Sequence, residues 1–265
     1  MLFRQLCDPE TSTYTYVLAD ERTGEAILID SVREQFDRDC QLLGELNLKL
    51  LYTLETHVHA DHITASGLFR DSYGSLVLAS EASGVANADR LLREGDLVEF
   101  GSHVVVARAT PGHTVGCMTF VCHEEGMAFT GDALLIRGCG RTDFQQGDPK
   151  VLYRSVHQRI FTLPEDTLLY PGHDYRGRTV STIAEERRFN PRLGLDKNEA
   201  DFASIMDELN LAYPKRIDEA VPANLESGLK RLGPTAVEDE SAAPVAQVME
   251  ALGRQDSMHW DGGGI

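Results

Sequence analysis

Short apolar segments with the character of β-strands occupy much of the first half of the chain. Residues 13–19 (TYTYVLA) and 25–30 (EAILID) are separated by a polar stretch that contains Gly24, so they predict a β-hairpin. Residues 48–56 (LKLLYTLET) are almost continuously apolar, as expected of a buried central strand. Turn residues separate further predicted strands at residues 75–80, 96–100, 103–110, 117–122 and 127–132.

Apolar residues with helical spacing appear between and after these strands. Residues 33–47 place Phe36 and Leu43 on one helical face, and residues 62–74 predict a second helix that is closed by Gly74. Beyond the second group of strands we expect a strand that runs into a loop at residues 167–175. Three more helices are predicted, over residues 148–161, 180–189 and 199–210.

The order of these elements is strands, helix, strands, helix, in two roughly similar halves. Because each sheet must cover its apolar faces, this order favours two sheets packed face to face with helices outside. We expect one catalytic domain over residues 1–236. The composition changes near residue 237 to acidic residues, Ala, Pro and a terminal Gly run, so residues 237–265 are expected to form an extension with a short helix over 244–252.

The chain is acidic, with 42 Asp and Glu against 25 Lys and Arg and a formal net charge of −17. Phosphate groups would be repelled, so neither nucleic acid nor an anionic membrane is an expected partner. The apolar segments fall short of the roughly 18 residues of a membrane span. Five cysteines without a Cys-x-x-Cys pair, together with an N-terminus that has no leader pattern, predict a reducing compartment, the cytoplasm.

Residues 56–62 (THVHADH) crowd metal-ligand side chains directly behind the predicted central strand. His57 and His59 are two positions apart, so their side chains converge if the strand continues through them. Asp61 and His62 belong to the turn that enters the next helix. Such a cluster at a strand end predicts a metal site.

Three further ligand-type residues follow a strand and a glycine. His113 lies in PGHTVGC, Asp132 in TGDALL and His173 in YPGHDY. Four strand ends that deliver His and Asp to one edge are typical of a metal site, so all seven residues are candidate ligands. The remaining histidines have no such context and are expected outside the site: His103, His123, His157 and His259.

The motifs THVHADH, PGHTVGC, TGDALL and YPGHDY, in this order, resemble those of the metallo-β-lactamase superfamily. The resemblance implies an α+β fold, a four-layer αβ/βα sandwich with the metal site at one edge of the two sheets. The hydrolases of this superfamily hold two metals with seven such residues. Carried over to this chain, one site would use His57, His59 and His113, the other Asp61, His62 and His173, with Asp132 bridging.

Two longer segments, GDALLIRGCGRTDFQQGD and YPGHDYRGRTVSTIAEERRFNPRL, look like the persulfide dioxygenases, the branch related to the ethylmalonic encephalopathy protein. This branch holds one Fe²⁺ per chain, and the resemblance assigns to it His57, His113 and Asp132. Two histidines and one carboxylate leave open positions on non-haem iron for oxygen chemistry. Since the chain keeps all seven candidates, spacing alone is compatible with one metal or two. With one iron, the remaining four would orient the ligands or hold waters: His59, Asp61, His62 and His173.

The resemblance implies the oxidation of glutathione persulfide by O2 and water to glutathione and sulfite. Glutathione carries two carboxylates, so cationic side chains are expected near the metal. Arg141 is the favoured substrate-binding residue, followed by Tyr175 and Arg137. Cys139 lies in the same glycine-flanked loop, where it is either a small buried residue or a thiol close to the substrate.

Two other functions stay open. A thioester hydrolase similar to glyoxalase II would use all seven residues, two metals and a bridging hydroxide. The segment after His173, however, has no convincing match to the helical glutathione-binding domain of those enzymes. A metal-containing sensor or carrier without turnover would instead use residues 237–265 as a docking segment. A homodimer is expected by analogy alone.

Overall fold

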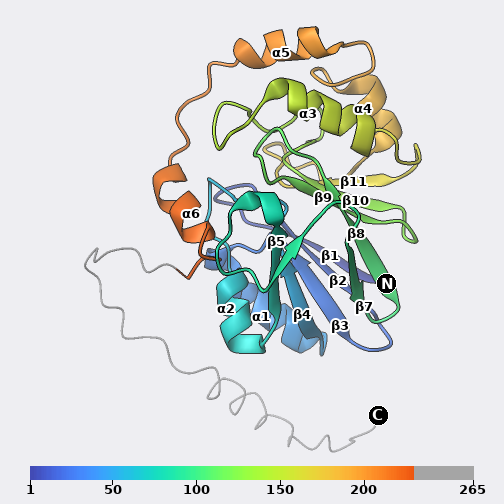
Figure 1. The fold of residues 1–265 in the computed structure, drawn as a ribbon. Coiled ribbons are helices and arrows are strands. Elements are labelled where there is room, and N and C mark those ends of the chain that lie inside the picture. Colours follow the sequence, from blue (N-terminus) through green and yellow to red (C-terminus); the bar gives the residue numbers. More distant parts are fainter. Residues whose placement is uncertain (230–265) are drawn as a thin grey trace, which may run out of the picture. The chain divides into compact units, whose positions relative to one another are not determined.

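Two six-stranded β-sheets face one another in the computed structural model, which describes residues 1–229 (Figure 1). The strand orders are β1-β2-β3-β4-β5-β6 and β12-β11-β10-β9-β8-β7. Helices cover the outer faces, so the predicted α+β sandwich is confirmed. The first sheet comprises β1 Leu2–Cys7, β2 Tyr14–Ala19, β3 Glu25–Ile29, β4 Lys49–Leu54, β5 Leu76–Ser80 and β6 Arg90–Leu92. The second comprises β7 Leu97–Phe100, β8 His103–Ala109, β9 Met118–Cys122, β10 Met127–Gly131, β11 Leu168–Pro171 and β12 Ser181–Thr182.

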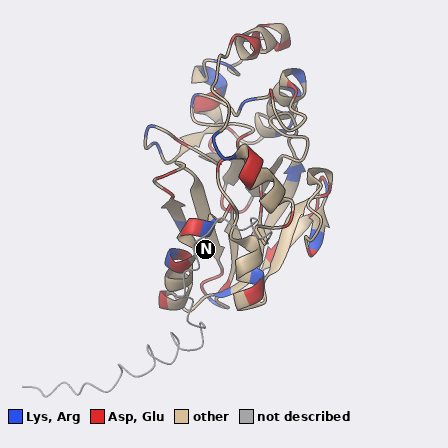
Figure 2. Ribbon diagram, turned by 90° about the vertical axis from the view of Figure 1, so that its left-hand side faces the viewer, with Lys and Arg blue, Asp and Glu red and all other residues tan. Residues whose placement is uncertain are grey.

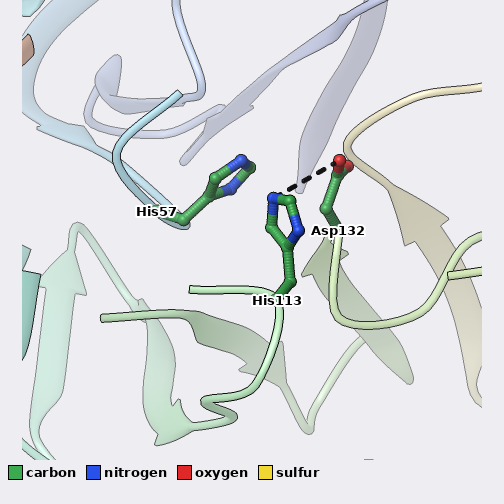
Figure 3. Close-up of side chains that lie close together, drawn as sticks. All are labelled: His57, His113 and Asp132. Carbon is green, nitrogen blue, oxygen red and sulfur yellow. Dashed lines mark ion pairs between the residues drawn. The ribbon is translucent and has the colours of Figure 1, made fainter. Parts of the chain in front are cut away.

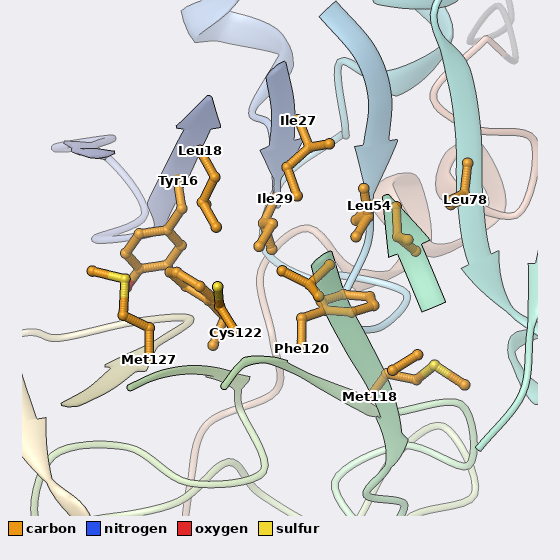
Figure 4. Packing of buried hydrophobic residues seen from close by; sticks show 14 of the residues in the cluster. Tyr16, Leu18, Ile27, Ile29, Leu54, Leu78, Met118, Phe120, Cys122 and Met127 are labelled. Carbon is orange, nitrogen blue, oxygen red and sulfur yellow. The ribbon is translucent and has the colours of Figure 1, made fainter. Parts of the chain in front are cut away.

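The core between the sheets follows from the two-residue period of the strands. Tyr16 and Leu18 of β2 belong to the apolar cluster between the sheets, whereas Val17 packs on the opposite face. On β9, Phe120 and Cys122 supply the same central cluster from the second sheet (Figure 4). The predicted hairpin is present as the antiparallel pair β2 and β3.

The outer faces of the sheets are covered by helices. Leu43 and Phe69 pack against Leu28 of the first sheet, while Leu152 and Phe202 belong to the apolar cluster on the second sheet. The helices are α1 Phe36–Glu45, α2 Ser66–Tyr73, α3 Pro149–Ser155, α4 Ile183–Phe189, α5 Glu199–Asp207 and α6 Ile217–Asn224. Single 3₁₀ turns lie at η1 Arg33–Gln35 and η2 Glu81–Ser83, and the π-helix η3 Val156–Ile160 continues α3.

The structure differs from the sequence-based expectation at the metal-ligand cluster. β4 ends at Leu54, so His57 and His59 lie in a loop and not on a continued strand. α2 begins at Ser66, four residues after the expected start at His62. The intervening residues stay outside the helix because their main-chain groups are bound by other parts of the chain. Strands β1, β6 and β12 and helix α6 were not predicted, since each is short or has a mixed pattern.

The described residues carry both signs of charge over their surface, and basic and acidic positions are interspersed on the face in Figure 2. Within residues 1–229, no helix is long and apolar enough to cross a bilayer. All five cysteines are free. The expected domain boundary at residue 236 and the extension over residues 237–265, with its helix, lie outside the described residues.

Candidate metal centre

The loops that follow β4, β8, β10 and β11 bring the candidate ligands together. His57, His113 and Asp132 each offer a ligand atom, and these atoms lie within 4.8 Å of one another. The Nε2 atom of His113 is 3.8 Å from Oδ2 of Asp132, and the ring of His57 stands almost perpendicular to that of His113, with centroids 4.8 Å apart (Figure 3). The three side chains converge from three different loops, as a shared ion would require.

The hydrogen bond of His113 fixes which ring nitrogen is free. Its Nδ1 lies 2.6 Å from the main-chain carbonyl oxygen of Arg141. A carbonyl only accepts, so Nδ1 carries the proton and donates it. Nε2 therefore presents a lone pair beside Asp132. A histidine anchored in this way through its other nitrogen is characteristic of metal sites.

The same argument applies to His57 through two linked hydrogen bonds. The Thr56 hydroxyl donates to Oδ2 of Asp30 at 2.7 Å, so it accepts from Nδ1 of His57 at 3.0 Å. Nε2 of His57 is left unprotonated. Burial, with the neighbouring rings of His59 and His113, holds the pKa of His57 well below its usual range. The imidazole is therefore neutral, as a metal ligand must be.

Asp132 is oriented by His173. Oδ1 of Asp132 accepts from Nδ1 of His173 at 2.7 Å, while Nε2 of His173 lies 3.0 Å from Oδ2 of Asp61. Burial disfavours a charged ring, but the carboxylates on both sides raise the pKa of His173 well above its usual range. His173 therefore donates from both nitrogens. Oδ2 of Asp132 remains directed toward the histidine ligands.

A second group, His59, Asp61 and His62, also has ligand atoms within 4.8 Å of one another. Nε2 of His59 lies 3.2 Å from Asp30 and 3.3 Å from Glu55. Burial opposes protonation, but these carboxylates raise the pKa of His59 to about 10. Within residues 1–229, Nδ1 of His59 and Nε2 of His62 are buried without a hydrogen-bond partner. Each nitrogen fits a water as a donor, or a metal ion once the ring has lost that proton, so the geometry is compatible with one metal or two.

Two glycines give the ligands room. A Cβ atom at Gly140 would lie 2.7 Å from Nδ1 of His113, and one at Gly172 would lie 2.7 Å from Oδ1 of Asp132. Both distances are shorter than nonbonded contacts allow. The glycines of the GCGR and PGH motifs are therefore required by the packing around the ligands.

A cleft of ≈ 640 Å³ opens beside His57, His113 and Asp132 and is lined by all four predicted substrate-binding residues. The guanidinium of Arg141 makes a bidentate pair with Asp143, at 2.6 and 2.7 Å, and lies 4.5 Å above the ring of Phe144. Tyr175 is 73% exposed, and its ring stacks near that of His173. Both side chains can therefore reach a molecule in the cleft.

The other two predicted residues are more constrained. The guanidinium of Arg137 is bound by Glu185 at 2.7 Å and also by Glu186, so it holds α4 against the loop after β10. Cys139 is buried, with its Sγ 3.8 Å from the sulfur of Met206. Burial raises the pKa of the Cys139 thiol to about 11.

Two arginines have no carboxylate partner in the described part of the chain, although both line the cleft: Arg176 and Arg192. Arg192 was not a predicted site residue. It follows α4 in the sequence NPRL, and its Nη1 lies 3.3 Å from the carbonyl oxygen of Cys139. The only sequence signal was its place at the end of the segment similar to the persulfide dioxygenases, since spacing does not bring it near the metal ligands.

The family model described as the metallo-beta-lactamase superfamily matches residues 8–173, more than half of the chain. The chain belongs to this superfamily. The mitochondrial persulfide dioxygenase ETHE1 of Bos taurus is 55% identical over 231 residues, which cover 87% of this chain and 90% of that protein. This places the chain in the persulfide dioxygenase branch, as the motifs predicted.

Solved structures agree with this placement. The crystal structure of ETHE1 from Myxococcus xanthus has a TM-score of 0.83 and 52% sequence identity, and the match covers 86% of this chain and 100% of the chain in that crystal structure. A hydroxyacylglutathione hydrolase of Cereibacter sphaeroides is more distant, 34% identical over 167 residues, which cover 62% of this chain and 64% of that enzyme.

Proposed function

We propose that the protein oxidises glutathione persulfide at a single ferrous iron bound by His57, His113 and Asp132. The reaction is GSSH + O2 + H2O giving GSH + H2SO3. The proposal is carried by one observation: both histidines present Nε2 lone pairs, fixed by the hydrogen bonds of Nδ1, beside one carboxylate oxygen. The two nearby relatives with the name ETHE1 support the choice of reaction.

Two histidines and one carboxylate fit ferrous iron, because such a set leaves several coordination positions open. Bound there, iron would supply the redox chemistry that joins O2 to the outer sulfur of the persulfide. The chain's own residues orient the reactants. Thr56 and the Arg141 carbonyl hold the two ligand rings in place, and His173 holds the ligand carboxylate.

The cleft suits an anionic thiol compound. Arg141 stands at its wall with Asp143 as its partner, and a substrate carboxylate can replace that exposed partner at little cost. Arg176 and Arg192 offer two more guanidinium groups, and glutathione has two carboxylates to bind. Tyr175 closes the side next to His173. The buried Cys139 thiol has a structural role in this proposal.

The decisive experiment measures iron and zinc per chain and follows O2 uptake with glutathione persulfide. We expect about one iron per chain and one O2 consumed for each sulfite formed. About two metals per chain, with S-lactoylglutathione hydrolysed and no O2 consumed, would instead establish the thioester hydrolase. Bound metal with neither activity would establish a sensor or carrier.

Two finer expectations belong to the same proposal. A cytoplasmic location is proposed from the cysteine content, whereas the curated relative from Bos taurus is named as mitochondrial. A homodimer is proposed by analogy. Fractionation of the source cells and sedimentation of the purified protein test these two points.

A further inference from the structure

Residues 55–65, between β4 and α2, form the metal-ligand loop. The side chain of Asn224, the last residue of α6, makes three hydrogen bonds to the main chain of this loop. Its Nδ2 donates to the carbonyl oxygens of His59 at 2.9 Å and His62 at 2.8 Å. Its Oδ1 accepts from the N–H of Thr64 at 2.9 Å. Asn224 is 4% exposed. Because the partners are two carbonyls and one N–H, they define the orientation of the amide.

The loop needs these partners because it is buried without regular structure. Residues 55–63 form neither helix nor strand, and most of them are shielded from solvent. Buried main-chain groups must find hydrogen bonds elsewhere. Asn224 supplies them from a position 160 residues beyond Thr64. The path of the loop is therefore set by the end of α6 as well as by its own residues.

The loop is also connected to the proposed iron ligands. Asp61 lies within it, and its Oδ2 holds Nε2 of His173 at 3.0 Å. Nδ1 of His173 holds Oδ1 of Asp132 at 2.7 Å. A displacement of residues 59–62 would move Asp61, then the ring of His173, and then the carboxylate of Asp132.

The turn after α6 is docked independently of this contact. The carbonyl oxygen of Leu225 accepts from Ala86, and that of Ser227 accepts from Gly67, both at 2.9 Å. Asn87 donates from Nδ2 to the carbonyl oxygen of Glu226 at 2.9 Å. Asn87 therefore anchors the same turn without touching the metal-ligand loop.

We propose that Asn224 is a positioning residue of the metal centre, which fixes residues 59–64 and, through Asp61 and His173, the carboxylate of Asp132. The proposal rests on the proposed assignment of Asp132 as an iron ligand. Helix α6 lies outside residues 8–173, the part matched by the superfamily model. The metal centre would then depend on a segment beyond the part of the chain that the superfamily model matches.

The test compares Asn224→Leu and Asn224→Asp with the matched control Asn87→Ala, in the full-length iron-loaded protein. Leu keeps the branched shape and the number of heavy atoms of Asn224 and removes all three hydrogen bonds, whereas Asp keeps the acceptor for Thr64 and loses both donors. The readouts are the rate of iron release to a ferrous chelator, the electron paramagnetic resonance spectrum of the nitric oxide adduct, kcat, KM and Tm.

Loss of a group that hydrogen-bonds a metal ligand directly costs about 10- to 100-fold in metal affinity or activity, and the lower end of that range applies to Asn224, which acts through Asp61 and His173. We expect both Asn224 variants to release iron about tenfold faster or more, with an altered nitric oxide spectrum and a lower kcat at similar KM. Asn87→Ala should lower Tm while iron release, the nitric oxide spectrum and kcat stay at the wild-type values.

Wild-type iron release and an unchanged spectrum in both Asn224 variants would overturn the proposal, as would equal effects in Asn87→Ala. Failure of both Asn224 variants to fold, while Asn87→Ala folds, would reject positioning in favour of a role in folding. Asp132→Ala in the same release assay tests the ligand assignment separately from the role of Asn224. If it retains iron as tightly as the wild type, the assigned ligand set is wrong, whatever Asn224 does.

Discussion

The Nδ1 atom of His113 is hydrogen-bonded to the main-chain carbonyl oxygen of Arg141, at 2.6 Å. Arg141 therefore has two separate functions in the proposed site. Its main chain sets the proton position on a candidate iron ligand, while its side chain faces the cleft. A side-chain substitution leaves the carbonyl in place, so the two functions can be separated by experiment.

Arg141→Ala is expected to raise KM for glutathione persulfide about tenfold or more, with iron content and kcat close to the wild type. The reason is the loss of a charge-assisted hydrogen bond, worth about 1.5–3 kcal/mol. Steady-state O2 uptake and metal analysis measure the effect. Arg154→Ala is the control, since Arg154 makes a similar bidentate pair with Glu199 away from the cleft. Unchanged KM in Arg141→Ala would remove Arg141 from substrate binding.

Asp132→Ala is expected to lose iron and O2 consumption together, because the set would lose its only carboxylate and His173 would lose an acceptor. Iron per chain after gel filtration and activity with added ferrous iron are the measurements. His157→Ala is a suitable control, as His157 stacks on Tyr153 outside the candidate centre. Full iron occupancy in Asp132→Ala would contradict the ligand assignment.

His62→Ala distinguishes one metal from two. In the one-iron proposal Nε2 of His62 is not a ligand, so the variant should keep about one iron per chain and a measurable kcat. In a two-metal site it should lose one of two ions, because His62 would be a direct ligand of the second. The ratio of metal content between variant and wild type decides between these outcomes.

The layers of the fold could be predicted from sequence because the apolar pattern of most strands is strong. The strand that precedes His57 was placed to within two residues, although its end at Leu54 was missed. The spacing of apolar residues does not indicate which main-chain groups form hydrogen bonds with side chains that are distant in the sequence. The contacts of Asn224 and of the Arg141 carbonyl depend on tertiary packing over 28 to 165 residues, so no local pattern indicates them.

The candidate ligands could also be predicted from sequence, since each motif puts a ligand-type residue at a strand end. The residues that surround these ligands could not be predicted. The buried carboxylate of Asp30, which binds Thr56 and His59, follows a strand without a distinctive motif. Arg137 was expected at the substrate, but its guanidinium is held by two glutamates of α4. Charge type can be read from sequence, whereas the partner of a charge depends on the fold.

Cys139 is expected to resist alkylation. Burial raises the pKa of its thiol to about 11, so at pH 8 only about one molecule in a thousand carries the reactive thiolate. Iodoacetamide should modify the exposed Cys7 first, with little loss of persulfide oxidation. Peptide mass spectrometry after a short labelling pulse gives the order. Rapid labelling of Cys139, prevented by glutathione, would instead place a reactive thiol at the substrate.

Asp39 is expected to destabilise the fold at neutral pH. It is 1% exposed in α1, where Oδ1 pairs with Arg38 and Oδ2 has no hydrogen-bond partner within residues 1–229. Burial outweighs Arg38 and raises the pKa of Asp39 from 3.8 to about 6. Between pH 3.8 and pH 6 the folded state therefore binds more protons than the unfolded state. The free energy of unfolding consequently falls as the pH rises through this range, and above pH 6 the buried charge destabilises the fold by its full amount.

Asp39→Asn removes the charge and should raise the free energy of unfolding at pH 7.5 by about 1–3 kcal/mol. The upper value is the shift of about two pKa units multiplied by 1.36 kcal/mol per unit. The gain should shrink toward zero below pH 4, where Asp39 is protonated in both states. Urea titrations at pH 7.5, 6 and 4 measure it. Asp37→Asn, on the exposed side of the same helix, controls for helix effects and should change stability little at any of these pH values. An equal gain in both variants, or one independent of pH, would show that burial of Asp39 is not its cause.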